Sequence, residues 1–297
     1  NRRAKRPIHS RNNDCSLWLI PLLWPHRGNT RLSVAADNIW NNEDEIEDGT
    51  DSDGNGYVDD IRGWDFVNNA SNAAPGEDGS LADNDPMDFK GHGTNVAGCA
   101  SAVTDNNTGI SGVGWNCTIM PLRSGYKGSD GNGYVQTNAA IQSIYYATAN
   151  GAAIINASFG GVAADYAERD AFRYAYNNGV LCIKAAGNDN SDVPPIPGKE
   201  DWMFSVAAVT SADRKSSFSN YGQWVKVAAP GSAIYTTNRN NRYGSTQGTS
   251  FSAPIVAGVA CLLRAVHHDC SPAQIMMHIV DKGDNIDAAN PGYEGLL

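Results

Sequence analysis

The sequence predicts a single α/β domain built around a mainly parallel β-sheet, and three observations carry that prediction. From residue 92 onward, short apolar runs typical of buried strands alternate with longer runs typical of helices. This alternation favours parallel strands joined by helical crossovers. The chain of 297 residues is 41% hydrophobic, which suffices for one substantial core. No internal repeat and no clean linker divides it.

The elements follow one another in a clear order. Residues 1–31 are an atypical N-terminal segment, basic and irregular at first and then strand-like over Leu17–Trp24. Residues 43–90 are acidic and rich in Asp, Asn and Gly, which favours loops. The strands expected beyond them are Cys117–Leu122, Ala152–Ile155, Val180–Ala185, Phe204–Val209 and Val225–Ala228. The helices expected between the first three of these are Thr137–Ala149 and Ala163–Asn177.

Charge and cysteine content exclude several classes of function. The formal charge of −10 argues against a nucleic-acid partner, which would need a basic face. The Leu17–Trp24 run is too short to cross a bilayer and contains Pro21, so no membrane partner is expected. The six cysteines form no C-x-x-C pair, which argues against zinc. Cys99, Cys182 and Cys261 lie in apolar runs, and we interpret them as small buried residues rather than disulfide partners.

A histidine lies between two glycines in the run G-H-G-T-N-V-A-G, residues 91–98. The glycines allow a sharp turn, and the small residues that follow let a helix pack closely. An isolated histidine is more often structural than catalytic. The position of His92 at the start of a helix favours a catalytic role.

A serine precedes a long apolar run in G-T-S-F-S-A-P, residues 248–254. Pro254 fits the first turn of a helix, and the run Ile255–Leu263 is apolar nearly all round, which predicts a central buried helix. Ser250 would lie at its N-terminus, where free N–H groups favour developing negative charge. The alternative is an N-cap serine without catalytic function.

An asparagine closes an expected strand in the run A-A-G-N, residues 185–188. The side-chain amide of Asn188 could donate a hydrogen bond to an oxyanion. The alternative is an ordinary turn residue after glycine.

Together, these three runs resemble the subtilase family in their order and approximate spacing, over about residues 32–297. The resemblance implies a three-layer α/β/α fold, subtilisin-like, with a mainly parallel central sheet. It implies a serine-type endopeptidase in which Ser250 attacks the scissile carbonyl and His92 accepts and returns the proton. Asn188 would stabilise the oxyanion. Residues 32–297 would be the peptidase domain, without the family's last helix.

The same resemblance implies a substrate site and a setting. The pocket for the residue before the scissile bond would be walled by Ser158, Phe159, Gly160, Ala186 and Gly187, and the segment beginning at Gly125 would pair with an extended peptide. The expected partner is a peptide or protein substrate. We expect a monomer that is secreted or held at the cell surface.

The aspartate that would complete the triad is missing. The family carries it in a D-[ST]-G stretch after a hydrophobic strand, but Leu17–Trp24 has no carboxylate. One interpretation is a reading-frame error. Codons read from the last base of Ser16 permit Val-Val-Ala-Asp-Ser/Thr at this place, although the next codon cannot be Gly. The other is a divergent strand in a catalytically impaired pseudoenzyme that binds peptides.

The acidic run D-S-D-G-N-G-Y-V-D-D, residues 51–60, has the pattern of a calcium loop. Oxygen donors alternate along it, and its sixth residue is glycine. The predicted ligands are Asp51, Asp53, Asn55, Tyr57 through its carbonyl, and Asp59. The twelfth position is not Glu, so a further ligand is needed, with Asp60, Glu47 and Asp48 nearby in sequence. The ion would be structural rather than catalytic. The alternative is a solvated turn.

Overall fold

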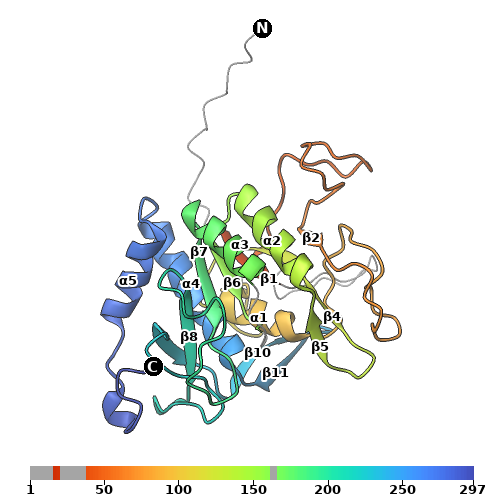
Figure 1. Cartoon of the computed structure of the whole chain (residues 1–297). Coiled ribbons are helices and arrows are strands. Elements are labelled where there is room, and N and C mark those ends of the chain that lie inside the picture. Colours follow the sequence, from red (N-terminus) through yellow and green to blue (C-terminus); the bar gives the residue numbers. More distant parts are fainter. Residues whose placement is uncertain (1–15, 21–37, 161–165) are drawn as a thin grey trace.

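A seven-stranded parallel sheet crosses the molecule in the order β2-β3-β1-β6-β7-β8-β9 (Figure 1). The computed structural model describes residues 38–160 and 166–297 in full. For residues 16–20 it describes the backbone alone. Every strand pair in this sheet is parallel. The strands are β1 (Ser16–Ile20), β2 (Trp64–Asp65), β3 (Thr118–Arg123), β6 (Ile154–Ala157), β7 (Leu181–Ala185), β8 (Phe204–Val209) and β9 (Val227–Pro230). The predicted α/β class is confirmed.

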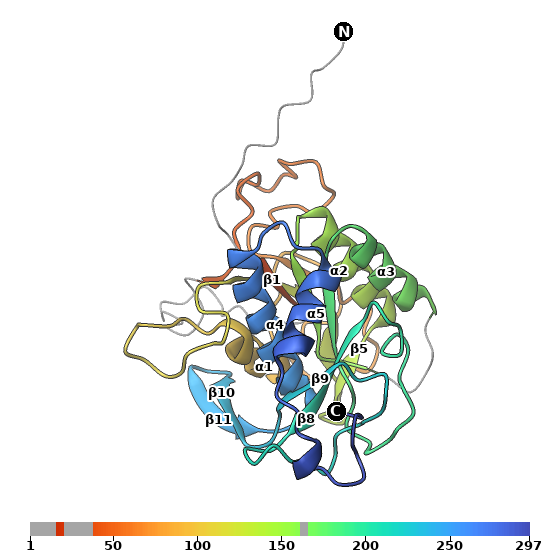
Figure 2. The same ribbon diagram turned by 90° about the vertical axis from the view of Figure 1, so that its left-hand side faces the viewer.

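Helices cover both faces of this sheet (Figure 2). One face carries α2 (Thr137–Ala149) and α3 (Tyr166–Asn177), and the other carries α1 (His92–Ser101), α4 (Thr249–Val266) and α5 (Pro272–Lys282). Alternate residues of a strand enter opposite cores, since successive side chains point to opposite faces. On β6, for example, Ile154 packs with α1 and α4 while Ile155 packs with α2 and α3. The expected three layers are therefore present.

The predicted elements agree with the structure in kind and differ at their ends. The helix Thr137–Ala149 and the strand Phe204–Val209 have the predicted bounds. The other expected strands are shifted by one or two residues toward the C-terminus at one or both ends. The apolar run Leu17–Trp24 supplies β1, which lies between β3 and β6 in the sheet. Residues 163–165 of the helix predicted from Ala163 lie outside the described residues.

Helix α4 crosses the centre of the molecule. Among the described residues it is the one helix long and apolar enough to cross a membrane by length and composition. Most of it is buried, however, and it packs on α1 and on β6 to β9. It is thus the central core helix predicted from Ile255–Leu263.

Two antiparallel hairpins flank the sheet: β4 (Gly125–Lys127) with β5 (Gly133–Val135), and β10 (Ile234–Asn238) with β11 (Arg242–Thr246). The second packs on α1, where Thr237 donates to the carbonyl of Thr94. Gly98 makes this close approach possible, because a Cβ there would lie 2.2 Å from Thr237 Oγ1.

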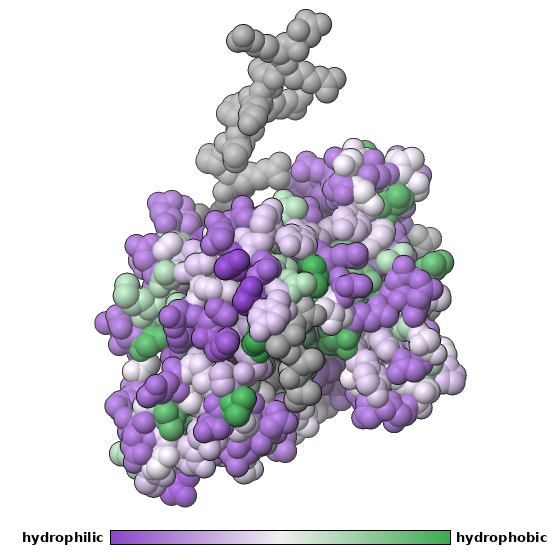
Figure 3. All heavy atoms as spheres, in the orientation of Figure 1, coloured by the Kyte–Doolittle hydropathy of each residue, from purple (hydrophilic) through white to green (hydrophobic). Residues whose placement is uncertain are grey.

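The surface seen in Figure 3 is mostly hydrophilic, with hydrophobic residues scattered among polar ones. Scattered apolar residues of this kind are normal on a water-exposed protein face. The hydrophobic residues on this face therefore do not by themselves indicate a binding site.

Candidate active site

Four chain segments meet at the carboxyl edge of the sheet. Ser158 follows β6, Asn188 follows β7, His92 begins α1, and Ser250 is the second residue of α4. All four line one cleft of about 620 Å³. The three residues predicted to be catalytic are thus brought together, although His92 and Ser250 lie 158 positions apart in sequence.

His92 is held at the N-terminus of α1 by a capping carboxylate. Asp88 accepts hydrogen bonds from the backbone N–H groups of Gly91 at 2.6 Å and Thr94 at 3.1 Å, and from the Thr94 hydroxyl at 2.6 Å. Gly91 adopts the left-handed conformation, with φ of 96°, that this tight turn requires. The imidazole packs beside the Phe251 ring, with centroids 5.6 Å apart. Burial lowers the pKa of His92, and the negative charge of Asp88 opposes that shift.

The hydroxyl of Ser250 donates to the carbonyl of Ser158 at 3.1 Å. Within the described part of the chain, the Ser250 hydroxyl is hydrogen-bonded to this carbonyl and not to the His92 imidazole. A rotation about the Cα–Cβ bond of Ser250 redirects the hydroxyl within the cleft that His92 also lines. Catalytic hydrogen bonds often form only with substrate present.

The backbone carbonyl of Ser250 is anchored from outside its helix. Pro254 lies within α4, in its second turn, so the prediction of a first-turn position was wrong. Since proline has no N–H, it cannot bond the carbonyl four residues earlier, which is that of Ser250. The Ser158 hydroxyl donates to this carbonyl instead, at 2.8 Å, and accepts from Asn156 Nδ2 at 2.9 Å. The hydrogen bonds from the Asn156 amide to the Ser158 hydroxyl, and from that hydroxyl to the Ser250 carbonyl, therefore fix the backbone of Ser250.

The side-chain amide of Asn188 has a defined orientation. Its oxygen accepts from the Thr249 N–H at 2.9 Å and from the Thr249 hydroxyl at 3.1 Å. The amide nitrogen must then point the other way, and Asn188 lines the cleft. This geometry leaves an N–H donor beside Ser250, the arrangement that an oxyanion hole needs.

A second hollow, of about 480 Å³, adjoins the first. Ser158, Phe159 and Gly160 line both hollows, and Ala186 and Gly187 line the second. The structure thus gathers these five predicted substrate-binding residues around Ser250.

Gly125, the sixth predicted substrate-binding residue, lies on the inner strand of the first hairpin. It lines the larger hollow, and at the other end of β4 the backbone of Lys127 accepts from the Ala74 N–H and donates to Glu77 Oε2. The outer strand β5 pairs only with β4 among the described residues, and its three residues are exposed. The prediction that the segment beginning at Gly125 pairs with an extended peptide stays a prediction.

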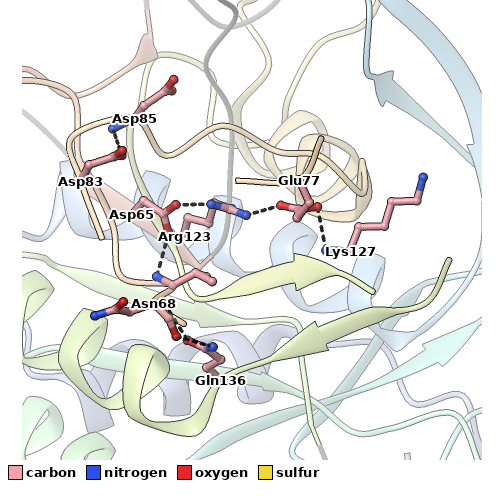
Figure 4. A network of polar contacts seen from close by, with 9 residues as sticks. Asp65, Asn68, Glu77, Asp83, Asp85, Arg123, Lys127 and Gln136 are labelled. Carbon is pink, nitrogen blue, oxygen red and sulfur yellow. Dashed lines mark hydrogen bonds and ion pairs between the residues drawn. The ribbon is translucent and has the colours of Figure 1, made fainter. Parts of the chain in front are cut away.

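A buried ion-pair network lies behind this hairpin (Figure 4). Arg123, at the end of β3, pairs with both Asp65 and Glu77. Burial raises the pKa of Asp65 to about 8, while the Arg123 guanidinium opposes the shift. Glu77 also accepts the Lys127 N–H at 2.9 Å, so the network ties β2 and β3 to β4. These residues escaped the sequence analysis because their partners lie 46 and 58 positions apart.

No carboxylate completing a triad can be assigned. Residues 16–31 contain neither Asp nor Glu, and residues 21–37, where the D-[ST]-G stretch would be sought, lie outside the described residues. Asp14 and Asp37 also lie outside the described residues. What the structure adds is the position of β1, whose end points to the same edge of the sheet as the ends of β6 and β7.

The acidic loop is folded by its own carboxylates. Asp51 accepts from the backbone N–H groups of residues 54–56, which lowers its pKa, and Asp59 accepts from those of residues 48 and 49. Asn55 accepts from the Tyr57 N–H. Of the five predicted ligands, Asp53 belongs to a group whose carboxylate oxygens lie within 4.8 Å of one another.

The other members of that group are Glu45 and Asp60. Asp60 was a candidate in the sequence because it adjoins the loop. Glu45 was not, and its carboxylate is held here because it accepts from the backbone N–H groups of residues 52 and 53. Burial raises the pKa of Asp60. A second such group, formed by Asp65, Asp78 and Asp83, adjoins Arg123. Either acidic cluster could hold a metal ion, although the second already has a guanidinium as counter-charge.

Comparison with known proteins agrees with this geometry. The model of the subtilase family matches residues 28–294. Thermitase of Thermoactinomyces vulgaris is 40% identical over 203 residues, which are 68% of this chain and 67% of thermitase. A thermophilic serine proteinase of a Bacillus species is 41% identical over 203 residues. The matched residues are 68% of this chain and 46% of that proteinase, so the chain spans about half the length of that relative.

Solved structures agree as well. A protease of Pseudoalteromonas arctica superposes with a TM-score of 0.72 at 26% identity, over 95% of this chain and 87% of that one. A cold-adapted subtilisin-like serine proteinase superposes with a TM-score of 0.65 at 25% identity, over 92% and 84% of the two chains. The resemblance inferred from the three motifs is confirmed: the chain belongs to the subtilase family, whose class of enzyme is the serine endopeptidase.

Proposed function

We propose that this chain hydrolyses peptide bonds as a serine endopeptidase, with Ser250 as nucleophile and His92 as general base. The observation that carries the proposal is the meeting of His92, Asn188 and Ser250 in one cleft, with the amide nitrogen of Asn188 left pointing away from Thr249. No structural role explains all three together.

The steps follow from this arrangement. Ser250 Oγ attacks the scissile carbonyl, and its proton passes to His92, which then gives it to the leaving amine. The oxyanion is bound by Asn188 Nδ2 and by the backbone N–H of Ser250 at the start of α4. Water then attacks the acyl-enzyme, with His92 again as base, and regenerates Ser250.

The substrate is a peptide or an unfolded protein segment. It would lie extended between the segment beginning at Gly125 and the segment Ser158–Gly160, which line the same hollow, adding main-chain hydrogen bonds in the manner of β-augmentation. The residue before the scissile bond would enter the second hollow, between Ser158–Gly160 and Ala186–Gly187.

The alternative is a pseudoenzyme that binds peptides without cleaving them, because no triad aspartate has been assigned. In subtilisin, loss of that carboxylate lowers kcat by about 3 × 10⁴-fold. The test is hydrolysis of denatured casein by the chain and by its Ser250→Ala variant. Turnover at least about a hundredfold above the variant supports the endopeptidase, and equal rates refute catalysis by Ser250.

A structural calcium ion accompanies this proposal. Hard oxygen ligands are what calcium takes, and Glu45, Asp53 and Asp60 supply three carboxylates close together. The amides of Asn42 and Asn55 now donate to both Asp53 and Asp60. Rotating either amide would present its oxygen to an ion there, so the residues fit. Asp51 and Asp59 would shape the loop around it.

Removal of calcium should lower the melting temperature, because an ion bound only by the folded state stabilises it. An unchanged melting temperature in excess chelator would refute the calcium site. We further propose that the protein acts outside the cell. A relative in Xanthomonas campestris, 33% identical over 235 residues, is named an extracellular protease. Detection of the mature chain in culture medium would test this.

A further inference from the structure

Lys184 is a buried charge beneath the substrate cleft that the catalytic scheme does not use. It lies on β7, and its side chain is 1% exposed. The ammonium donates to the carbonyl of Phe159 at 3.0 Å and lies 3.4 Å from Glu168 Oε1. It also lies over the rings of Phe159 and Phe172, 4.8 and 5.7 Å from their centroids.

Such a charge is costly to bury unless it is fully partnered. An apolar side chain would fill this part of the core, which contains Phe172 and Cys182, at lower cost. The contacts of the ammonium therefore show what it contributes. Two of its four partners, a carbonyl and a ring, belong to one residue, Phe159.

Phe159 is the middle residue of the segment that separates the two hollows of the cleft. The carbonyl of Ser158 points toward the nucleophile, whose hydroxyl it accepts. The next carbonyl, that of Phe159, points into the protein, where Lys184 binds it. Lys184 thus holds the segment from behind, at the residue adjoining the one that contacts Ser250.

We infer that Lys184 is a positioning residue, which fixes the segment Ser158–Gly160 so that an extended peptide binds with its scissile carbonyl at Ser250. This inference rests on the proposed function. Glu168 lines the cleft and shares the ion pair, in which it balances the ammonium charge. The role requires that Lys184 affect extended substrates, which also pair with the main chain of this segment, more than short ones, which contact it only at the pocket for the residue before the scissile bond.

The test compares Lys184→Met with wild type on two substrates: a tetrapeptide 4-nitroanilide and an N-acetyl amino-acid 4-nitrophenyl ester. Misplacement by about 1 Å costs on the order of a hundredfold in rate. We expect kcat/KM for the tetrapeptide to fall about 10- to 100-fold, and that for the ester to fall less than about threefold. Lys226→Met is the matched control, because Lys226 pairs at the surface with the fully exposed Asp201, and it should change neither value.

Two further variants keep the test decisive. Glu168→Gln retains the bond from Lys184 to Phe159 and should preserve the ratio of the two substrates. Lys184→Gln, whose amide is too short to reach Phe159, should change the ratio as Lys184→Met does, and it serves if the methionine variant does not fold. An equal fall for both substrates, or no fall in a folded variant, would overturn the inference.

A binding measurement separates this inference from the proposed function. In the Ser250→Ala background, anisotropy of a fluorescein-labelled tetrapeptide reports binding without turnover. Lys184→Met should weaken that binding about tenfold, and Lys226→Met should not. If wild type cleaves neither substrate while this difference remains, the catalytic proposal fails and the positioning role stands. If the difference is absent, the positioning role fails whatever the turnover.

Discussion

Ser158→Ala is the perturbation whose effect can be worked out most fully from the structure. The Ser158 hydroxyl donates to the Ser250 carbonyl, which receives no hydrogen bond from Pro254 because proline has no N–H. The same hydroxyl accepts from Asn156 Nδ2. Asn156 and Ser158 are both buried. The substitution therefore leaves one donor and one acceptor without their partners.

The magnitude follows from those two groups. A buried polar group left unsatisfied costs about 1–3 kcal/mol, so two cost about 2–6 kcal/mol. The Ser250 carbonyl borders the cleft, where water can replace the lost bond, and this brings the expected loss to the lower half of that range. A loosened Ser250 backbone should also lower kcat about 10- to 100-fold, because nucleophile placement is sensitive to shifts near 1 Å.

The assay needs a control variant that removes the hydroxyl of a buried serine lying outside the cleft. Ser205, on β8, is fully buried and donates to the Gly198 carbonyl at 2.7 Å, and it lines neither hollow. Both Ser158→Ala and Ser205→Ala should lower the melting temperature. Only the first should lower kcat, measured per titrated active site at a temperature where both are folded. Equal kcat values for the two variants would refute the proposed support of Ser250.

Three other outcomes are expected. Asn188→Ala should lower kcat by about 10²–10³-fold with little change in KM, as loss of an oxyanion donor does; steady-state kinetics with unchanged kcat would contradict that role. His92 must be neutral to act as a base, and burial lowers its pKa, so the midpoint of the acid limb of the kcat/KM profile should lie below pH 6.5. In Asp88→Asn, which removes the opposing negative charge, this midpoint should move to still lower pH. The same lowered pKa means that His92 contributes stability above pH 6.5 that is lost as pH falls toward its folded value. Gly98→Ala should cost about 1–3 kcal/mol by overpacking against Thr237, and an undiminished melting temperature would contradict the close contact of α1 with β10.

The sequence predicted what depends on local pattern. Apolar strands, the α2 bounds and the position of Ser250 at a helix start follow from periodicity and from flanking glycines. The three catalytic candidates were predicted because their short motifs, taken together, resemble those of the subtilase family. Even the error over Pro254 is local, since the helix begins one turn earlier than proline suggested.

What the sequence did not reveal depends on contacts between distant residues. Arg123 gave no signal, because its partners Asp65 and Glu77 are recognisable only once β2 and β3 are side by side. Lys184 read simply as part of an apolar strand, although it carries a charge into the core. The calcium ligands were predicted along one loop, whereas folding brings Glu45 from outside it to Asp53 and Asp60. Side-chain direction, which decides each of these cases, is set by tertiary packing.

One buried atom bears on the missing aspartate. Asn156 uses its Nδ2 to donate to Ser158, and its Oδ1, also buried, has no hydrogen-bond partner among the described residues. Such an atom costs about 1–3 kcal/mol unless a donor reaches it. Asn156 is paired in register with Leu19 of β1 and with Ile183 of β7.

A leucine or isoleucine side chain cannot supply that donor, whereas the shifted reading frame permits Asp and then Ser or Thr in the codons that begin with the last bases of Leu19 and Ile20. A hydroxyl is a hydrogen-bond donor, and a carboxylate in this stretch is what the triad of the family requires. We therefore expect resequencing of the nucleotides for residues 15–31 to restore this frame. An unbroken frame encoding Leu19 and Ile20 would overturn the prediction, and the orphan oxygen would then need a backbone N–H or a water molecule as its donor.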